Sequence, residues 1–286
     1  MIRTFLLAGA ALASLAACVS PPAAAPKAAV KVYTLDCGRM QLNDADGFAD
    51  DGSMRGVSRA LVNPCFLIRH PSGDLMWDTG FPEALADLPN GLDPPGFDAH
   101  IVMARKVTAQ LNDLGLKPAD IEFVSFSHRH ADHVGNGNVF AGSTWIVDKD
   151  ERDAMFSAAA RGDAQSFGAY SALENARTTP IEGDAVHDVF GDGSVTIHQA
   201  PGHTPGHCVL LVKTGGGARV LLTGDMWHLA ESREKRLVPR FNFDRAMTLA
   251  SMDKVEALAR SENARIVRQH VPEDVATLPA FPAALE

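Results

Sequence analysis

Apolar residues recur along this chain mainly as short runs, either alternating with polar residues or continuous. The first run covers residues 30–37, and residues 60–70 and 75–80 form a hairpin across the turn Pro-Ser-Gly-Asp. Val, Ile, Phe and Trp are frequent in these runs and Gly, Pro and Asp bound them, which is typical of β-strands. Further strands are expected at residues 121–127, 194–200, 208–214, 219–225 and 264–270.

Helical periodicity marks fewer segments. Residues 100–114 place apolar side chains near one face with Gly115 as C-cap, and Asp244 would cap a second helix. A strand–helix unit is expected over residues 143–156. The strands fall in two groups, each followed by helices, so we expect an α/β fold of two packed sheets with helices outside, in one domain over residues 30–286. The apolar face of the second helix consists of Met252, Val255, Leu258 and Ala259.

The amino-terminal segment has the layout of an export signal. A basic Arg3 precedes an apolar run and small residues, and Leu-Ala-Ala-Cys ending at Cys18 resembles a bacterial lipobox. We therefore expect residues 1–17 to be a lipoprotein-type signal peptide, Cys18 to be lipidated, and residues 18–29 to be a Pro/Ala-rich tether. This predicts a lipid-anchored protein of the bacterial cell envelope, periplasmic or outer membrane. The alternative is an ordinary signal peptide with a chance cysteine.

The charge balance argues against a nucleic-acid surface. The chain has 26 Lys and Arg against 35 Asp and Glu, with no long basic run. The short basic segment 233–236 is expected to be a solvated face. An acidic exterior is compatible with a small-molecule substrate, and a homodimer is left open.

The remaining cysteines form no metal-binding or disulfide framework that the sequence can define. Cys37, Cys65 and Cys208 cannot all pair, and no Cys-x-x-Cys occurs. Cys208 lies in an apolar run and is expected to be a small buried side chain. A disulfide between Cys37 and Cys65 is left open.

Ligand chemistry is concentrated in the stretch Ser-His-Arg-His-Ala-Asp-His. Its candidate ligands are His128, His130, Asp132 and His133. Imidazole and carboxylate are the donors that zinc prefers, and a catalytic zinc keeps one position open. His128 and His130 would point the same way in an extended segment, whereas adjacent Asp132 and His133 would diverge. This arrangement indicates two half-sites rather than one complete site.

The other half of the ligands is expected at distant strand ends. His203, Asp225 and His270 each follow a strand-like run and sit beside glycine or proline, where a turn projects the side chain over the sheet edge. An isolated histidine is more often structural, and this interpretation is kept for His70 and for His187 and His198.

The series His-x-His-x-Asp-His, then His203, Asp225 and His270, resembles that of the metallo-β-lactamase superfamily, and Asp78-Thr-Gly resembles its early strand end. The resemblance covers nearly the whole chain after residue 29. It implies an αββα sandwich with two divalent metal ions, zinc being the expected ion. It assigns Asp225 as the bridge and Asp78 as support for the ligands. The first metal would be held by His128, His130 and His203, and the second by Asp132, His133 and His270.

Within the superfamily, residues 63–80 and 240–259 are most similar to N-acyl-homoserine lactone hydrolases. The resemblance implies quorum quenching by lactone ring opening, through attack of a hydroxide that bridges the metals. Asp132 and Asp225 would take part as ligands. His228 would contact the substrate carbonyl, although those hydrolases carry a tyrosine at the matching position, three residues after the bridging aspartate.

An acyl lactone also needs an apolar groove for its tail. Phe48, Met54 and Phe97, with Leu92 and Met103, could line such a groove, or they could be ordinary packing. A β-lactamase-like or phosphotriesterase-like hydrolase on the same dinuclear site is the alternative function. A surface lipoprotein that only binds metal is a third.

Overall fold

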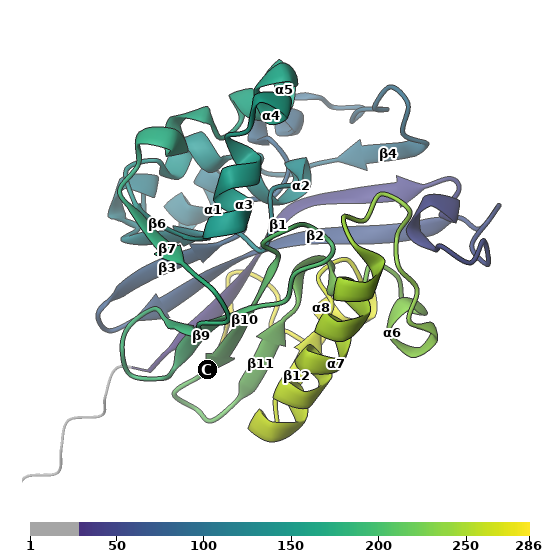
Figure 1. Cartoon of the computed structure of the whole chain (residues 1–286). Coiled ribbons are helices and arrows are strands. Elements are labelled where there is room, and N and C mark those ends of the chain that lie inside the picture. Colours follow the sequence, from purple (N-terminus) through teal and green to yellow (C-terminus); the bar gives the residue numbers. More distant parts are fainter. Residues whose placement is uncertain (1–28) are drawn as a thin grey trace, which may run out of the picture.

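The computed structural model of the protein describes residues 29–286. Two β-sheets pack face to face, and helices cover the outer face of each (Figure 1). The larger sheet has the order β13-β1-β2-β3-β5-β6-β7, with β4 paired to β1, and the smaller has the order β12-β11-β10-β9-β8. The predicted αββα sandwich is thus confirmed.

The strands of the larger sheet are β1 (Lys31–Leu42), β2 (Arg59–His70), β3 (Gly73–Trp77), β4 (Ala99–Val102), β5 (Phe123–Ser125), β6 (Thr144–Asp148), β7 (Thr178–Ile181) and β13 (Ala284–Leu285). Those of the smaller sheet are β8 (His187–Asp188), β9 (Val195–Gln199), β10 (Cys208–Lys213), β11 (Arg219–Leu222) and β12 (Arg265–Val267).

The α-helices are α1 (Val107–Asp113), α2 (Ala131–Val134), α3 (Lys149–Met155), α4 (Ala158–Gly162), α5 (Ala164–Gly168), α6 (Ser232–Lys235), α7 (Arg245–Glu262) and α8 (Pro272–Val275). Short 3₁₀ helices occur at Asp46–Phe48, Glu83–Asp87, Pro118–Asp120, Gly137–Phe140, Ser171–Asn175 and Gly224–Met226.

Alternation along the strands explains the layers. In β2, Phe66 and Ile68 face the other sheet, whereas Cys65 and Leu67 face the helices outside. In β10, three side chains face the other sheet and two pack beneath α7. Successive side chains of a strand point to opposite faces, and strands covered on both faces read as continuous apolar runs. The β10 side chains are Cys208, Leu210 and Val212 toward the larger sheet, and Val209 and Leu211 toward Met252 and Val255.

The predicted helix over residues 100–114 is wrong in its first half. Residues 99–102 form β4, in which Ile101 pairs with Met40 of β1, and the helix begins only at Val107. The free hydrogen-bonding groups along the β1 edge decide this, because pairing there outweighs a local helical periodicity. The helix after Asp244 is confirmed, since the Asp244 side chain accepts a hydrogen bond from the Met247 backbone at 2.8 Å.

A disulfide between Cys37 and Cys65 joins β1 to β2, which resolves the pairing that the sequence left open. Cys208 is free and buried, as expected. The predicted signal peptide, the lipidation site Cys18 and all but the last residue of the tether lie outside the described residues. Within residues 29–286, no helix combines the length and the apolar character needed to cross a bilayer.

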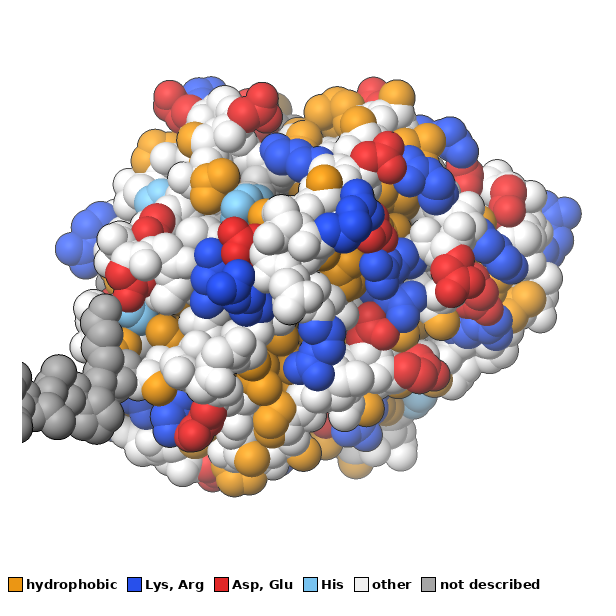
Figure 2. Space-filling model, turned by 90° about the horizontal axis from the view of Figure 1, so that it is seen from below, with side chains coloured by type: hydrophobic (Ala, Val, Ile, Leu, Met, Phe, Trp, Pro, Cys, Tyr) orange, Lys and Arg blue, Asp and Glu red, His pale blue; other side chains and the backbone are white. Residues whose placement is uncertain are grey.

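Charges of both signs are interspersed on the surface. Figure 2 shows Lys and Arg side chains next to Asp and Glu side chains over one face, with apolar side chains between them. Ion pairs such as Arg233 with Glu256 and Arg236 with Asp253 join α6 and the residue after it to α7. At these pairs, positive and negative charges therefore neutralise each other locally.

Strand direction brings several loops to one edge of the sandwich. β3 and β5 are parallel in the larger sheet, and β11 and β12 are parallel in the smaller sheet. β9 runs in the same direction as β11, because both are antiparallel to β10. The segments that follow these strands contain most of the candidate ligands named above.

Candidate metal centre

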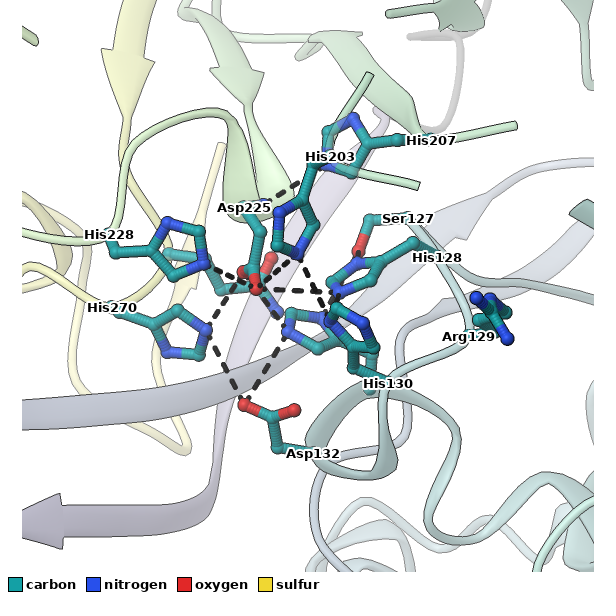
Figure 3. A network of polar contacts seen from close by, with 12 residues as sticks. Ser127, His128, Arg129, His130, Asp132, His203, His207, Asp225, His228 and His270 are labelled. Atoms are coloured by element: carbon teal, nitrogen blue, oxygen red, sulfur yellow. Dashed lines mark hydrogen bonds and ion pairs between the residues drawn. The ribbon is translucent and has the colours of Figure 1, made fainter. Parts of the chain in front are cut away.

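All seven predicted ligands come together in two adjoining groups, and Figure 3 labels six of them. His128 and His130 lie in the segment between β5 and α2, and α2 carries Asp132 and His133. The three distant ligands come from the smaller sheet: His203 lies in the turn between β9 and β10, Asp225 follows β11 and His270 follows β12. Side chains separated widely in sequence thus form two groups, His128, His130, His203 and Asp225, and Asp132, His133 and His270.

The carboxylate of Asp225 lies between the two groups. Its Oδ2 is 3.4 Å from Nε2 of His128 and 3.3 Å from Nε2 of His203. Its Oδ1 is 3.1 Å from Nε2 of His133 and 2.9 Å from Nε2 of His270. Each oxygen therefore faces a different group, which is the geometry of a bridging ligand.

The spacing of the donor atoms fits divalent metals. In the first group, Nδ1 of His130 is 2.8 Å from Nε2 of His128 and 3.1 Å from Nε2 of His203. In the second, Oδ2 of Asp132 is 3.7 Å from Nε2 of His133 and 3.6 Å from Nε2 of His270. Ligand atoms around a tetrahedral zinc, at about 2.0–2.1 Å from the metal, lie roughly 3.3 Å apart. The cluster is compatible with divalent metal binding.

Hydrogen bonds on the far side of the rings orient two histidines. Nδ1 of His133 is 2.9 Å from Oδ2 of Asp78, and Nδ1 of His270 is 2.9 Å from the carbonyl oxygen of Val62. When each Nδ1–H donates to its oxygen, the lone pair of Nε2 faces the centre, as a metal requires. The carboxylate of Asp78 also accepts bonds from Ser127 and Gln269, so it lies directly behind His133, and its supporting role stays a prediction.

The charge states of the buried histidines and of Asp225 favour a cation in the cluster. Burial lowers the pKa of His128 and of His130 well below the usual value, so both rings are neutral at pH 7. Burial opposes charge on His133 too, but the carboxylates of Asp225 and Asp132 outweigh it and raise its pKa well above the usual value. Burial likewise acts against ionisation of Asp225, yet the surrounding imidazoles hold its pKa well below the usual value. A cation is thus favoured beside Asp225.

His228 lies beside Asp225 on the wall of a cavity. The residue is 2% exposed, and its Nε2 lies 3.0 Å from Oδ2 of Asp225. Their relative orientation does not suit a hydrogen bond, and Nε2 has no other partner among the described residues. The ring also packs against Phe48 and Phe241, with ring centres 5.4 and 5.8 Å away. The structure thus places His228 beside the ligand cluster, and its contact with a substrate stays a prediction.

An apolar cavity of about 860 Å³ opens beside the cluster. Phe48, Leu92 and Phe97 line it, as the groove hypothesis expected. Met54 and Met103 do not, and this part of the hypothesis is wrong. Both are buried within the hydrophobic core on the helical side of the larger sheet. Other large apolar side chains on its walls are Met40, Leu61, Phe81, Leu85, Leu88, Ile101 and Phe241.

One histidine at the centre was not assigned a role from the sequence. His207 is fully buried, and its Nε2 accepts the backbone N–H of Asp225 at 3.1 Å. Its Nδ1–H donates to the carbonyl oxygen of Ala200 at 3.1 Å. Burial lowers the pKa of His207 to about 3, so the ring stays neutral and can accept that bond. His207 is the second histidine of Gly-His-Thr-Pro-Gly-His, and its place in this motif was the one sign in the sequence that it belongs to the site.

The sequence of this chain is similar to those of known enzymes. Residues 59–270 match the sequence profile of the Metallo-beta-lactamase superfamily. The N-acyl homoserine lactonase AttM of Azorhizobium caulinodans is 29% identical over 253 residues, which cover 85% of this chain and 94% of that protein. An N-acyl homoserine lactonase of Bacillus cereus is 28% identical over 256 residues, covering 88% and 97%.

Solved structures agree with this likeness. An N-acyl homoserine lactone hydrolase with the product N-hexanoyl-L-homoserine at its catalytic metal center matches with a TM-score of 0.74 and 25% identity, covering 89% of this chain and 98% of that one. AidC, a dizinc quorum-quenching lactonase, matches with a TM-score of 0.61 and 17% identity, covering 89% of each chain. The second likeness concerns the fold alone.

Proposed function

Because the chain belongs to the metallo-β-lactamase superfamily, we propose that it is a metal-dependent hydrolase that opens the ring of N-acyl-homoserine lactones. One observation carries the proposal: the Asp225 carboxylate faces two groups of ligands at the inner end of an apolar cavity. Hydrolysis of these lactones would make the protein a quorum-quenching enzyme.

Two divalent ions, with zinc expected from the imidazole and carboxylate donors, would be held by the seven ligands. When bound, such a pair activates water as the nucleophile and polarises the carbonyl that it attacks. The chain's own contribution is orientation. Asp78 holds His133, the Val62 carbonyl holds His270, and His207 holds the backbone of Asp225. Ligands held in this way need little rearrangement during the reaction.

His228 is placed to handle the substrate carbonyl. Burial lowers its pKa, an effect that the nearby Asp225 carboxylate opposes, and a neutral ring can donate one hydrogen bond. Its Nε2 has no suitably directed partner in the described part of the chain, and it faces the same side of Asp225 as the first ligand group. We propose that it donates to the lactone carbonyl, the task that a tyrosine would have in the hydrolases that the sequence resembles.

The cavity is suited to an acyl tail. Four of the nine large apolar side chains that are exposed within residues 29–286 line it: Leu88, Leu92, Phe97 and Phe241. Single exposed apolar side chains are ordinary, whereas a group at the mouth of a cavity is typical of a ligand groove. We propose that the tail runs from the ligand cluster toward these side chains.

We also propose export and lipid anchoring at Cys18, supported by Leu-Ala-Ala-Cys and the Pro/Ala-rich segment after it. The expected product is a diacylglyceryl cysteine at the mature amino terminus, found by mass spectrometry of membrane-extracted protein. An unmodified amino terminus in a soluble periplasmic fraction would contradict this.

A substrate panel on purified, zinc-loaded protein tests the function. Acyl-homoserine lactones of increasing chain length, a chromogenic cephalosporin and an aryl phosphotriester are compared by kcat/KM. The lactones are expected to be the best substrates. A higher kcat/KM for the cephalosporin or the phosphotriester than for every lactone would favour the alternative hydrolase instead.

A further inference from the structure

Glu151 is a buried carboxylate outside the ligand cluster. It lies in the first turn of α3, and only 3% of it is exposed. A buried carboxylate is unfavourable unless hydrogen bonds compensate for the water that it loses. The donors that compensate Glu151 are therefore informative.

The two carboxylate oxygens bind two different turns. Oε1 accepts the backbone N–H of Arg129 at 2.8 Å, and Oε2 accepts the backbone N–H of Gly206 at 2.8 Å. Arg129 stands between His128 and His130, on the side of the larger sheet. Gly206 belongs to the turn of the smaller sheet that carries His203. One side chain thus joins the two segments that supply the histidines of the first ligand group.

Close packing fixes this junction. A Cβ atom on Gly206 would lie 2.2 Å from Oδ1 of Asp148 and 2.5 Å from the backbone N of Glu151, so only glycine allows this approach. Asp148 caps α3 by accepting bonds from the backbone of Asp150 and Glu151, and it also binds the amide of Gln199 at the end of β9. The start of α3, from which the Glu151 side chain projects, is therefore held in place, and the carboxylate reaches both turns.

The hydrogen bond to Arg129 comes from its backbone and not from its side chain. Figure 3 shows the Arg129 side chain lying apart from the ligand cluster. Its Nε is 4.0 Å from Oε1 of Glu151, beyond hydrogen-bonding distance. What Glu151 holds is therefore the position of the peptide between His128 and His130.

We propose that Glu151 is a positioning residue that sets the distance between His130 and His203, and so the affinity and geometry of the first metal position. Nδ1 of His130 and Nε2 of His203 are 3.1 Å apart, and each belongs to one of the two turns that Glu151 joins. This inference rests on the proposed metal site, and not on the identity of the substrate.

Zinc affinity and the spectrum of the cobalt-loaded protein test the inference. In Glu151→Gln, the single amide oxygen can accept only one of the two N–H groups, and the amide NH₂ faces the other. We expect one of the two metals to bind about 10- to 100-fold more weakly, in competition with a chromophoric chelator, while the other keeps its affinity. The visible absorption of the cobalt-loaded variant should differ from that of the wild type.

The matched control is Asp74→Asn. Asp74 is also a buried carboxylate, but it pairs with Arg69 at the opposite end of β3 from Asp78. This variant should keep both metal affinities and the cobalt spectrum, and its thermal stability is measured alongside them. A merely structural role for Glu151 would give that same pattern in Glu151→Gln, and it would overturn the inference.

If Glu151→Gln does not fold, Glu151→Asp decides, because it keeps the charge but is too short to reach both turns. Weaker binding of one metal supports the inference, and wild-type affinity at both positions overturns it. Since no lactone is used, wild-type protein that binds two metals but hydrolyses no lactone would contradict the proposed function only.

Discussion

The ligand cluster and the apolar cavity share a boundary but are built on opposite principles. In the cluster, two ligand rings are oriented by hydrogen-bond partners on their far side, Asp78 behind His133 and Val62 behind His270. In the cavity, walls such as Phe97 and Phe241 have side chains without hydrogen-bonding groups and are 38% and 46% exposed. Polar geometry tolerates little displacement, whereas apolar contact changes gradually with area. The two regions should therefore respond to substitution very differently.

The largest effect is expected for Asp225→Asn, which removes the charge between the two ligand groups. We expect kcat/KM to fall by about 1000-fold or more, with some metal still bound by the histidines. Elemental analysis and kinetics on the same preparation measure both quantities. One metal per chain in active wild-type protein would show that the two-metal arrangement is wrong.

The next effect concerns the boundary of the two regions. His228→Ala should lower kcat/KM by about 10- to 1000-fold without changing the metal content, because it removes one hydrogen-bond donor to the carbonyl. His228→Tyr, which restores a donor, is the matched control and should recover part of the activity. Wild-type kinetics in the alanine variant would mean that His228 only packs against Phe48, and loss of a metal would mean that it is a ligand.

A graded effect is expected in the cavity. Each buried methylene adds about 0.8 kcal/mol, so kcat/KM should rise up to about fourfold per CH₂ of the acyl chain until the cavity is full. Phe97→Ala should cost about fivefold with a dodecanoyl lactone and less than twofold with a butanoyl lactone. Equal losses with both substrates would indicate that the tail does not reach Phe97.

The smallest effect is expected at the surface, in Asp192→Asn. Hydrogen bonds from Ser194 and His70 lower the pKa of Asp192 to about 2. Because this value lies below that of the unfolded chain, the stabilisation is complete above about pH 4 and is lost as the pH falls through about 2. The Tm of the variant should lie below that of the wild type by less than about 2 °C, and by the same amount at pH 5 and pH 8. Calorimetry at both pH values measures this. A difference that grows between these pH values would assign the contribution to another group.

The strands and the candidate ligands could be predicted because each is indicated by residues that are close together in the sequence. The strands alternate or run continuously as the layers require, and the ligand residues are of types that rarely cluster without a metal. The helix over residues 100–114 failed because β4 pairs with β1, a contact between distant segments. The prediction that Met54 and Met103 line the groove was wrong for a related reason. Apolar character alone does not distinguish a side chain in a cavity wall from one in the core.

By itself, the sequence determined the two groups of strands, the ligand series from His128 to His270 and the choice of metal chemistry. These follow from local alternation and from donor types, which are properties of residues read in order. Only the tertiary structure decided that one Asp225 oxygen faces each ligand group, that Glu151 joins the turns of both sheets, and which apolar residues form the cavity. Each of these depends on distances between segments far apart in the chain, and packing of the two sheets sets those distances.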